Sequence, residues 1–525
     1  MLQVTNVSLQ YGSKKLFEDV NLKFTSGNCY GIIGANGAGK STFLKILSGE
    51  IEPNKGEVSL GKNERMSVLM QNQNAYDGEM VVRTVMLGHK RLVEIMDEKD
   101  ALYAKPDFSD EDGIRASELE SEFAELNGWE AESEAETLLN ELDIPAECHG
   151  MLMADLDAKM KVKVLLAQAL FGNPDVLLLD EPTNNLDLKT VRWLENYLLD
   201  FENTIIIVSH NRHFLNKVCT YICDVDYGKI QLFLGNYDFW YQTSQLIARQ
   251  MRDQNKKAEQ RAKELQEFIA RFAANASKSR QATSRKKELE RLTINDIKPS
   301  LRKYPFIDFK FEREIGNDIL SVEGLTKKGY FEDLSFIVQK NEKIGFVSEK
   351  STTITMLFDI LTGKAEPDAG TVRWGKTINV SVLPQNNGEF FDGCDLSLVE
   401  WLSQFSNDHY EEYLRGWLGR MLFSGEEALK KAKVLSGGEK VRCMLAKMML
   451  EGGNFLIMDE PTNHLDLESI TALNNGMNNF KGCILFTSHD QELMNTVANR
   501  IIEINGKKTF DKNVGFDEYL DLTGN

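Results

Sequence analysis

The feature that most constrains the fold of this chain is a repetition of its own sequence. The stretch Val-Leu-Leu-Leu-Asp-Glu-Pro-Thr-Asn at 176–184 recurs as Phe-Leu-Ile-Met-Asp-Glu-Pro-Thr-Asn at 455–463, an offset of 279 residues. Upstream, Gln71 matches Gln385 at an offset of 314, because the first copy carries 35 additional residues after its glutamine. A repeat of this length predicts two homologous domains, the first of which contains an insertion.

Length and composition set the class of protein. The chain has 525 residues and a formal net charge of −19, which suits two to four domains and argues against a general nucleic-acid coat. The sequence contains no run of about 18 apolar residues, so it predicts no membrane-spanning helix. Residues 1–5 are typical of a strand and not of a signal peptide. The seven cysteines are scattered, so we expect reduced thiols in the cytoplasm and no zinc site.

The insertion is strongly acidic. It lies within about 77–148 and holds 16 acidic and three basic residues between positions 94 and 136. Leu119, Phe123 and Leu126 recur at helical spacing, so we expect a helical arm. This arm is either a solvated hairpin or a docking arm, and its charge favours a basic protein over RNA as a partner.

The segment between the two copies has the opposite charge. From Arg249 to Lys303 there are 16 basic and seven acidic residues. Apolar side chains recur there every three or four residues, which predicts a helix from about 242 to 273, a turn, and a returning helix. The candidates for nucleic-acid contact near the turn are Lys278, Arg280, Arg285, Lys286 and Lys287.

A phosphate-binding motif opens the first copy. Residues 34–42 fit the pattern G-x-x-x-x-G-K-[ST] and lie between an apolar strand and a helical run. In such a loop, glycines let backbone N–H groups surround a phosphate, and the lysine reaches the β- and γ-phosphates. The predicted ATP-binding residues are Gly34, Ala35, Asn36, Gly37, Ala38, Gly39, Lys40, Ser41 and Thr42.

Two adjacent carboxylates follow the apolar strand of the repeat. Asp180 ends that strand, where it can hold Mg²⁺ together with Ser41 and Gln71. Glu181 is placed to act as general base on the attacking water, and His210 is the candidate for a γ-phosphate contact. The predicted cofactors are ATP and Mg²⁺, and the predicted catalytic residues are Glu181, His210, Lys40 and Gln71.

The most diagnostic motif in the chain is Leu-Ser-Gly-Gly-Glu-Lys at 435–440. Its serine, Ser436, lies 23 residues before Asp459. Together with the phosphate loop and the Asp-Glu pairs, this motif resembles the signature of ATP-binding cassette (ABC) proteins. Two cassettes joined by a basic helical hairpin, with an arm in the first, resemble the ABC-F translation factors. The short hairpin tip and the run Ala-Gln-Ala-Leu-Phe-Gly-Asn-Pro-Asp at 167–175 are most similar to the YbiT-like branch of that family.

The resemblance implies an α/β fold with two ABC-type P-loop nucleotide-binding domains in tandem, joined by a long α-helical hairpin linker. The first domain would span 1–240, the linker 241–303 and the second domain 304–525. In this family each ATP lies between the P-loop of one cassette and the signature of the other. The signature residues that would contact ATP in trans are Ser436, Gly437, Gly438 and Glu439.

The resemblance also implies partners. The family binds the ribosomal E site, with the linker directed toward rRNA and the P-site tRNA, and the acidic arm would meet a ribosomal protein. The two cassettes would pair within one chain, so we expect a monomer. The adenine would stack on an aromatic side chain of an early strand, for which Tyr11 is the first candidate and Phe17 the alternative, although a core role suits either.

One of the two composite sites departs from the family pattern. Where the first signature should begin, Asp157 replaces serine and both glycines are missing. In the second P-loop, Ile354 stands in place of the lysine and residues 347–355 contain no glycine. Both defects fall in the same site, whose other residues are kept. The residues of this degenerate site are Ile354, Thr355, Asp459, Glu460, His489 and Asp157.

Three functions stay open on these observations. The first is an ABC-F-type ATPase that binds the ribosome near the E site, regulates translation, and hydrolyses ATP to ADP and phosphate in one intact composite site. The second is a nucleotide-gated, ribosome-binding pseudo-ATPase with little turnover, which the asymmetric damage motivates. The third is the ATPase subunit of a membrane transporter, which the long basic linker fits poorly.

Overall fold

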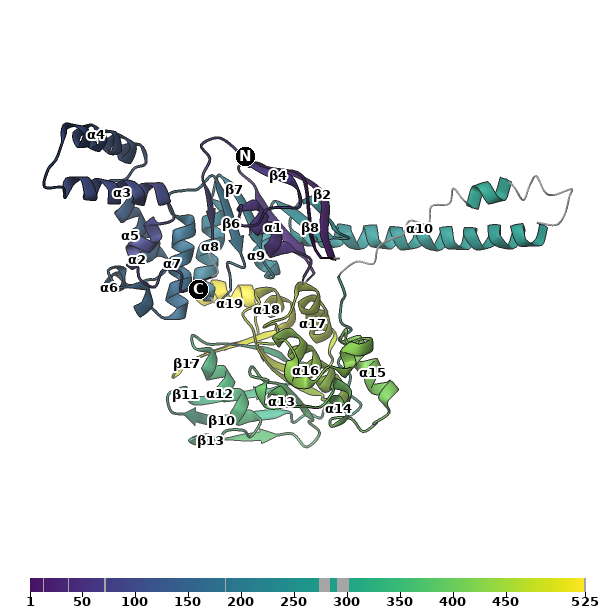
Figure 1. The fold of residues 1–525 in the computed structure, drawn as a ribbon. Coiled ribbons are helices and arrows are strands. Elements are labelled where there is room, and N and C mark those ends of the chain that lie inside the picture. The colour runs from purple at the N-terminus through teal and green to yellow at the C-terminus, as the bar shows by residue number, and fades with distance from the viewer. Residues whose placement is uncertain are drawn as a thin grey trace. The chain divides into compact units, whose positions relative to one another are not determined.

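The computed structural model describes residues 1–12, 14–35, 37–69, 72–184, 186–272, 284–289 and 302–523. The chain forms two compact units, which are treated separately below (Figure 1). Residues 1–209 and 214–301 belong to one unit, which holds the linker helix and the first cassette except for residues 210–213, and the second cassette begins at Arg302. Both units have α/β architecture with a largely parallel sheet, so the predicted fold class is confirmed.

The first cassette is built on a six-stranded sheet of order β5-β6-β7-β3-β8-β9. Its strands pair in parallel except for β9, which runs antiparallel to β8. A separate antiparallel sheet has the order β2-β1-β4. The strands are β1 (Leu2–Tyr11), β2 (Lys14–Phe24), β3 (Cys29–Gly34), β4 (Lys55–Leu60), β5 (Met66–Val68), β6 (Val176–Asp180), β7 (Thr204–Val208), β8 (Tyr221–Asp226) and β9 (Lys229–Leu234).

Apolar runs explain the central strands. Strands β3 and β7 are buried along their whole length, as expected for parallel strands that are covered on both faces. Helix α1 (Lys40–Leu47) contributes Phe43 and Ile46 to the same core as the strand residues Ile32 and Leu178. The carboxyl ends of parallel strands share one sheet edge, so the loop after β3 and the end of β6 meet there.

The insertion forms a helical arm, as its pattern predicts. Helices α3 (Lys90–Tyr103) and α4 (Asp110–Glu125) pair as a hairpin, with Leu119 and Phe123 buried between them and Arg91 2.5 Å from Glu122. Figure 1 shows this hairpin projecting from the remaining helices of the first cassette. Those helices are α2 (Val81–Met86), α5 (Ala131–Glu141), α6 (Ala146–His149), α7 (Ala158–Leu170), α8 (Leu188–Leu199) and α9 (Arg212–Val218).

The linker begins with one long helix. Helix α10 (Tyr237–Phe272) starts about five residues before its predicted position, and the predicted end at residue 273 lies outside the described residues. Residues 284–289 are also helical, and Glu288 lies 2.6 Å from Arg261 of α10, which supports the predicted return of the chain. Of the candidates for nucleic-acid contact, Arg285, Lys286 and Lys287 lie on this segment. Lys278 and Arg280 lie outside the described residues.

The second cassette repeats the topology of the first. Its sheets have the orders β14-β15-β16-β12-β17-β18 and β11-β10-β13, which match the first cassette strand for strand. The strands are β10 (Leu320–Lys327), β11 (Phe331–Val338), β12 (Lys343–Val347), β13 (Ala369–Trp374), β14 (Val380–Leu383), β15 (Phe455–Asp459), β16 (Cys483–Thr487), β17 (Arg500–Asn505) and β18 (Lys508–Lys512). The helices are α12 (Ser351–Leu361), α13 (Gly388–Phe391), α14 (Leu398–Ser403), α15 (Glu411–Arg420), α16 (Gly437–Glu451), α17 (Leu467–Asn479), α18 (Gln491–Val497) and α19 (Phe516–Thr523).

None of the helices that the structure describes is a candidate for a membrane span. Within the described ranges, every helix is too short or too polar to cross a bilayer.

Candidate ATP-binding sites

The phosphate loop of the first cassette connects β3 to α1. Gly37 and Gly39 have φ angles of 75° and 104°, a region that favours glycine. A β-carbon added to Gly34 would lie 2.7 Å from the carbonyl oxygen of Val225, so this position has no room for a side chain. The glycines of the motif are therefore required by the fold of the loop itself.

Lys40 is the first residue of α1 and is buried, with 7% of its surface exposed. Its Nζ donates hydrogen bonds to the carbonyl oxygens of Gly34 at 2.8 Å and Ala35 at 3.4 Å. The ammonium group is thus folded back along the loop, where a bound phosphate would share it with these carbonyls. Gly39 provides no side-chain cap for α1, which leaves the helix N-terminus open to an anion.

The carboxylate pair lies where the sequence predicts. The hydroxyl of Ser41 donates a hydrogen bond to Asp180 Oδ1 at 3.4 Å, so the two oxygen ligands expected for Mg²⁺ are neighbours. The N–H of Glu181 donates to the carbonyl oxygen of Val208 at 2.8 Å, which fixes Glu181 at the end of the sheet with a positive φ of 52°. Hard oxygen donors of this kind fit a magnesium ion.

The other predicted residues of this site are only partly described. Asn36 and Gln71 lie outside the described residues, and of Tyr11 only the backbone, at the end of β1, is described. Phe17 is fully buried in the core of the cassette, so Tyr11 is the candidate that remains for adenine stacking. His210 lies between β7 and α9 and is partly buried.

The second cassette has no phosphate loop. Three residues separate β12 from α12, whereas five separate β3 from α1. Because Ile354 matches Lys40 in the repeat, α12 begins three residues early and occupies the positions of the last loop residues. Ile354 is 1% exposed and belongs to the apolar core. The second cassette has therefore lost more than the glycines of the phosphate loop, because the first residues of α12 take the place of the end of that loop.

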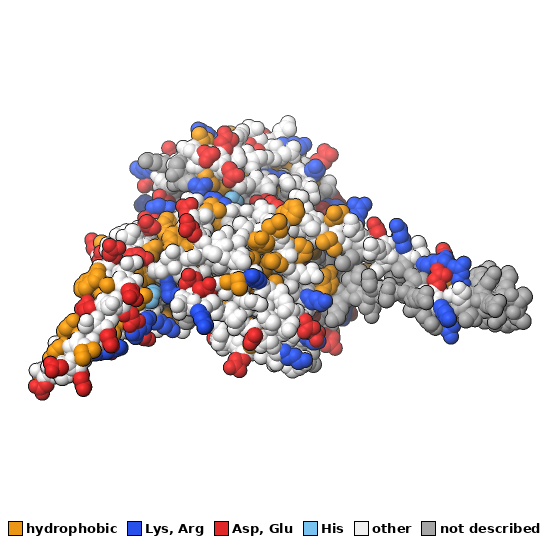
Figure 2. All heavy atoms as spheres, turned by 90° about the horizontal axis from the view of Figure 1, so that it is seen from above, with side chains coloured by type: hydrophobic (Ala, Val, Ile, Leu, Met, Phe, Trp, Pro, Cys, Tyr) orange, Lys and Arg blue, Asp and Glu red, His pale blue; other side chains and the backbone are white. Residues whose placement is uncertain are grey.

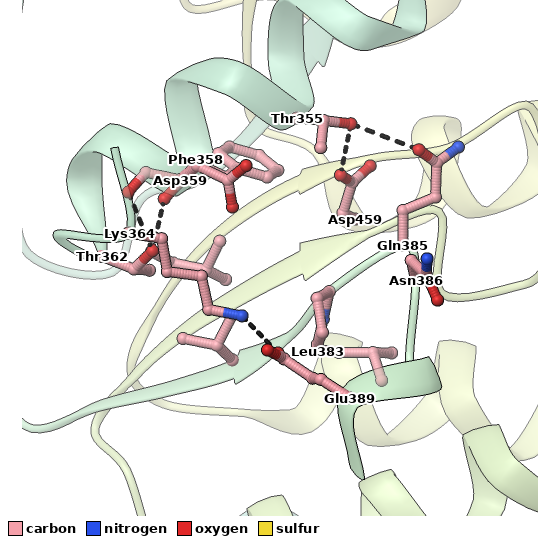
Figure 3. A pocket seen from close by; sticks show the side chains of 13 residues that line it. Thr355, Phe358, Asp359, Thr362, Lys364, Leu383, Gln385, Asn386, Glu389 and Asp459 are labelled. Carbon is pink, nitrogen blue, oxygen red and sulfur yellow. Dashed lines mark hydrogen bonds and ion pairs between the residues drawn. The ribbon is translucent and has the colours of Figure 1, made fainter. Parts of the chain in front are cut away.

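The second cassette brings together the residues that match Ser41, Gln71 and Asp180 of the first, as Figure 3 shows for Thr355, Gln385 and Asp459. Thr355 Oγ1 lies 2.7 Å from Asp459 Oδ2 and 3.3 Å from Gln385 Oε1, at the edge of a cavity of about 280 Å³. Burial raises the pKa of Asp459 to about 6, and burial also raises the pKa of Glu460. The N–H of His489 donates to Glu460 Oε2 at 3.1 Å. The carboxylates and the histidine therefore persist without the loop that would bring a phosphate to them.

The intact signature begins helix α16. Ser436 is its N-cap, and the Ser436 N–H donates to the carboxylate of Glu439 at 2.9 Å. Burial opposes ionisation of Glu439, yet this N–H and the Lys430 ammonium, 3.1 Å away, hold its pKa below the ordinary value. Both contacts fix the first turn of the helix.

Asp157 takes the equivalent place in the first cassette. Its carboxylate caps α7 by accepting the N–H of Met160 at 2.8 Å. Aspartate preserves the helix cap that serine supplies in the other copy, while the hydroxyl is lost. The damaged signature is therefore still a well-formed helix start.

Sequence reasoning missed one contact of the intact signature. A β-carbon added to Gly438 would lie 2.5 Å from the carbonyl oxygen of His464, and one added to Gly437 would lie 2.9 Å from the His464 ring. The available signal was the histidine after Pro-Thr-Asn, which the second copy has and the first lacks.

Comparison with known proteins finds matches along the chain. A family model described as ABC transporter matches residues 17–184 and 331–463, and a second model with the same description matches 223–309. A Bacillus subtilis protein named uncharacterized ABC transporter ATP-binding protein YkpA is 62% identical to this chain, over 99% of the chain and 97% of the relative.

Two further relatives match along nearly the whole chain. The probable ATP-binding protein YbiT of Escherichia coli O157:H7 is 44% identical, over 100% of both chains. The energy-dependent translational throttle protein EttA of Haemophilus influenzae is 31% identical, over 95% of this chain and 91% of the relative. These matches include both cassettes and the linker, and the chain therefore belongs to the ABC-F family of tandem ATP-binding cassette proteins.

Proposed function

We propose that this ABC-F protein hydrolyses ATP in one composite site, binds the ribosome near its E site, and regulates translation in the cytoplasm. The asymmetry of the two cassettes carries the catalytic half of this proposal. The first cassette holds Lys40, Ser41 and Asp180 around an open phosphate loop. In the second cassette, α12 replaces that loop.

Each residue of the intact site has a role in this proposal. The loop N–H groups and Lys40 bind the β- and γ-phosphates. Ser41, Gln71 and Asp180 hold Mg²⁺, which when bound stabilises charge on the phosphate oxygens. Glu181 accepts a proton from the attacking water, and His210 contacts the γ-phosphate. The signature residues Ser436, Gly437, Gly438 and Glu439 complete the site from the second cassette when the nucleotide binds.

The charge of the linker and the similarity to a named relative support the ribosome as a partner. The linker segment from 249 to 303 is basic within an acidic chain, and the side chains of Lys286 and Lys287 are exposed. A basic projection of this kind binds phosphate backbones through counterion release. The relative EttA is named a translational throttle protein, which places a protein of the same architecture in translation.

The arm supports a basic protein partner. The three basic residues between 94 and 136 are all held within the arm, Lys99 by Glu120 at 2.9 Å, Lys105 by Asp112 at 2.5 Å and Arg115 by Glu98 at 2.8 Å. The acidic excess therefore faces outward, beside exposed apolar residues that include Phe108 and Ile114. Figure 2 shows acidic and apolar side chains together along this projection.

The test is ATP turnover by the full chain, with and without ribosomes, for the wild type and for Glu181→Gln. We expect turnover that ribosomes stimulate and that the variant loses, because the general base is gone. Glu57→Gln, a change at an exposed carboxylate of β4, is the matched control and should behave as the wild type. Turnover equally absent from all three proteins would overturn hydrolysis.

A nucleotide-gated binder with little turnover is the second candidate. Loss of the second phosphate loop favours it, because only one nucleotide would then drive closure of the cassettes. ATP-dependent ribosome binding without hydrolysis would support this alternative. Sedimentation with membranes instead of ribosomes would point to a transporter subunit.

A further inference from the structure

The two glycines of the intact signature are packed against a single residue. For Gly437, the three atoms nearest to an added β-carbon all belong to the His464 side chain, at 2.9, 3.0 and 3.2 Å. For Gly438, the nearest atom is the His464 carbonyl oxygen at 2.5 Å. Neither glycine has a positive φ, and both lie in the first turn of α16, where glycine is a poor helix former. Packing on His464, and not backbone conformation, therefore requires glycine here.

His464 is itself held in an unusual conformation. Its φ is 66°, which is uncommon for a residue with a side chain. The loop that carries it is fixed on both sides, because the Asn463 N–H donates to the Glu460 carbonyl at 3.2 Å and the Leu465 N–H donates to the Thr462 carbonyl at 3.2 Å. The carboxylate segment of the degenerate site thus determines where His464 lies.

The loop is anchored further to the neighbouring strand. The Glu460 N–H donates to the Thr487 carbonyl at 3.1 Å, and the hydroxyls of Thr462 and Ser488 lie 3.1 Å apart. Beside the contact is a cavity of about 220 Å³ that is lined by Gly437 and His464, among others. Shortening the His464 side chain would enlarge this cavity, so the support it gives to the signature would be lost without replacement.

The first copy of the repeat lacks both members of this contact. Its residues at the signature positions are Ala158 and Lys159 in place of the two glycines, and Asn185 stands in place of the histidine. The histidine is therefore present where the signature is intact and absent where it is damaged.

We propose that His464 is a positioning residue that holds the signature of the second cassette in the conformation that contacts ATP at the intact site. This inference rests on the proposed function, since it assumes that Ser436 and its neighbours complete the first cassette's site. It also gives the degenerate site a use. The segment from Asp459 to His464 has no phosphate to act on, yet it supports the signature that serves the other nucleotide.

The experiment compares full-length variants by kcat and KM for ATP, at a temperature at which circular dichroism shows every variant folded. We expect His464→Ala to lower kcat about tenfold with KM within about twofold, because the signature contributes chiefly in the closed, reacting complex. His464→Asn, which installs the residue of the first copy, should lie between. His409→Ala is the control, since His409 is an exposed histidine of the same cassette that bonds Ser403.

Two combinations distinguish positioning from a general structural role. Gly437→Ala should lower kcat in the wild type and lower it by a smaller factor in His464→Ala, because the ring atoms at 2.9 and 3.0 Å that it would strike are gone. The double variant Ser436→Ala/His464→Ala should lose less kcat than the product of the two single losses, because both residues act through the same signature. Losses that multiply in full, or no loss from His464→Ala, would overturn the inference.

The proposed function fails separately. If Ser436→Ala alone leaves ATP turnover unchanged, the second signature does not serve the first cassette, and the composite site is wrong whatever His464 does. If Ser436→Ala lowers turnover and the His464 variants do not, the composite site stands and only the positioning role is lost.

Discussion

A single hydroxyl occupies the same place in both cassettes. Ser41 bonds Asp180 at 3.4 Å, and Thr355 lies 2.7 Å from Asp459. Only the first pair adjoins a phosphate loop. Ser41→Ala should therefore lower ATP turnover about 10²-fold, because Mg²⁺ loses a ligand, whereas Thr355→Ala should leave it within about twofold. Phosphate release by the two full-length variants measures this. Similar losses in both would contradict a single working site.

The buried carboxyl of Asp459 makes stability depend on pH. Its pKa is raised by burial to about 6, above the ordinary value for aspartate of about 4. The folded chain therefore binds this proton more tightly, and the free energy of unfolding falls as the pH rises from about 4 to about 6. Asp459→Asn keeps an oxygen acceptor for Thr355 and cannot ionise. It should raise the unfolding free energy of the second cassette by about 1–3 kcal/mol above pH 6.

Urea denaturation at two pH values checks this prediction. The gain should be full near neutral pH and nearly vanish near pH 3, where wild-type Asp459 is largely protonated in both the folded and the unfolded state. A gain that is the same at both pH values would mean that the carboxylate charge is not its cause. Thr355→Ala offers a comparison, because it removes the hydrogen bond at 2.7 Å and leaves the ionisable group.

Short strings made the site residues predictable. The phosphate loop, the Asp-Glu pairs and the signature are each contiguous, so one sequence and its internal repeat identified them. The contact of His464 with Gly437 joins residues 27 apart in the chain, in a loop and a helix. The family resemblance likewise offered Tyr11 first and Phe17 as the alternative for adenine stacking, and only the packing showed that Phe17 belongs to the core.

Helix α12 shows what the sequence pattern did not reveal at the scale of an element. The loss of glycine predicted a phosphate loop that β-carbons block, but residues 351–353 form part of the helix and not a loop. Glycine had permitted the positive φ angles of the first loop, which residues with side chains avoid. Once the glycines are gone, the right-handed helical region is open to every residue there, and the helix extends backward by most of a turn.

Restoring the loop sequence should therefore restore the loop. Replacing residues 348–354 by the sequence of residues 34–40, Gly-Ala-Asn-Gly-Ala-Gly-Lys, supplies both the glycines and the lysine. In a Glu181→Gln background, which blocks hydrolysis, ATP bound per chain should rise from one to two by equilibrium dialysis. In a chain without the graft, replacing residues 34–40 by the sequence of residues 348–354 should reduce the ATP bound per chain to none. A grafted chain that still binds one ATP would show that more than the loop was lost.

At the scale of the whole molecule, the chain separates its charges. The parts were predictable because each has its own pattern: a repeat for the cassettes, an acidic helical period for the arm and a basic one for the linker. Between positions 94 and 136 the arm keeps its three basic groups in internal ion pairs, while the linker exposes Lys286 and Lys287. A basic linker in an otherwise acidic chain is the part expected to meet a polyanion.

Ribosome binding should follow that separation. Lys286→Glu with Lys287→Glu should weaken binding about 10–100-fold at low salt and reduce the dependence of log Kd on log salt by about 1–2, because two phosphate contacts are lost. The control makes the same charge change elsewhere, at Lys189 and Lys310, whose side chains are 76% and 81% exposed. Co-sedimentation with ribosomes over a range of salt measures both. If the control loses as much affinity, net charge and not the linker governs binding, and the linker is not the contact surface.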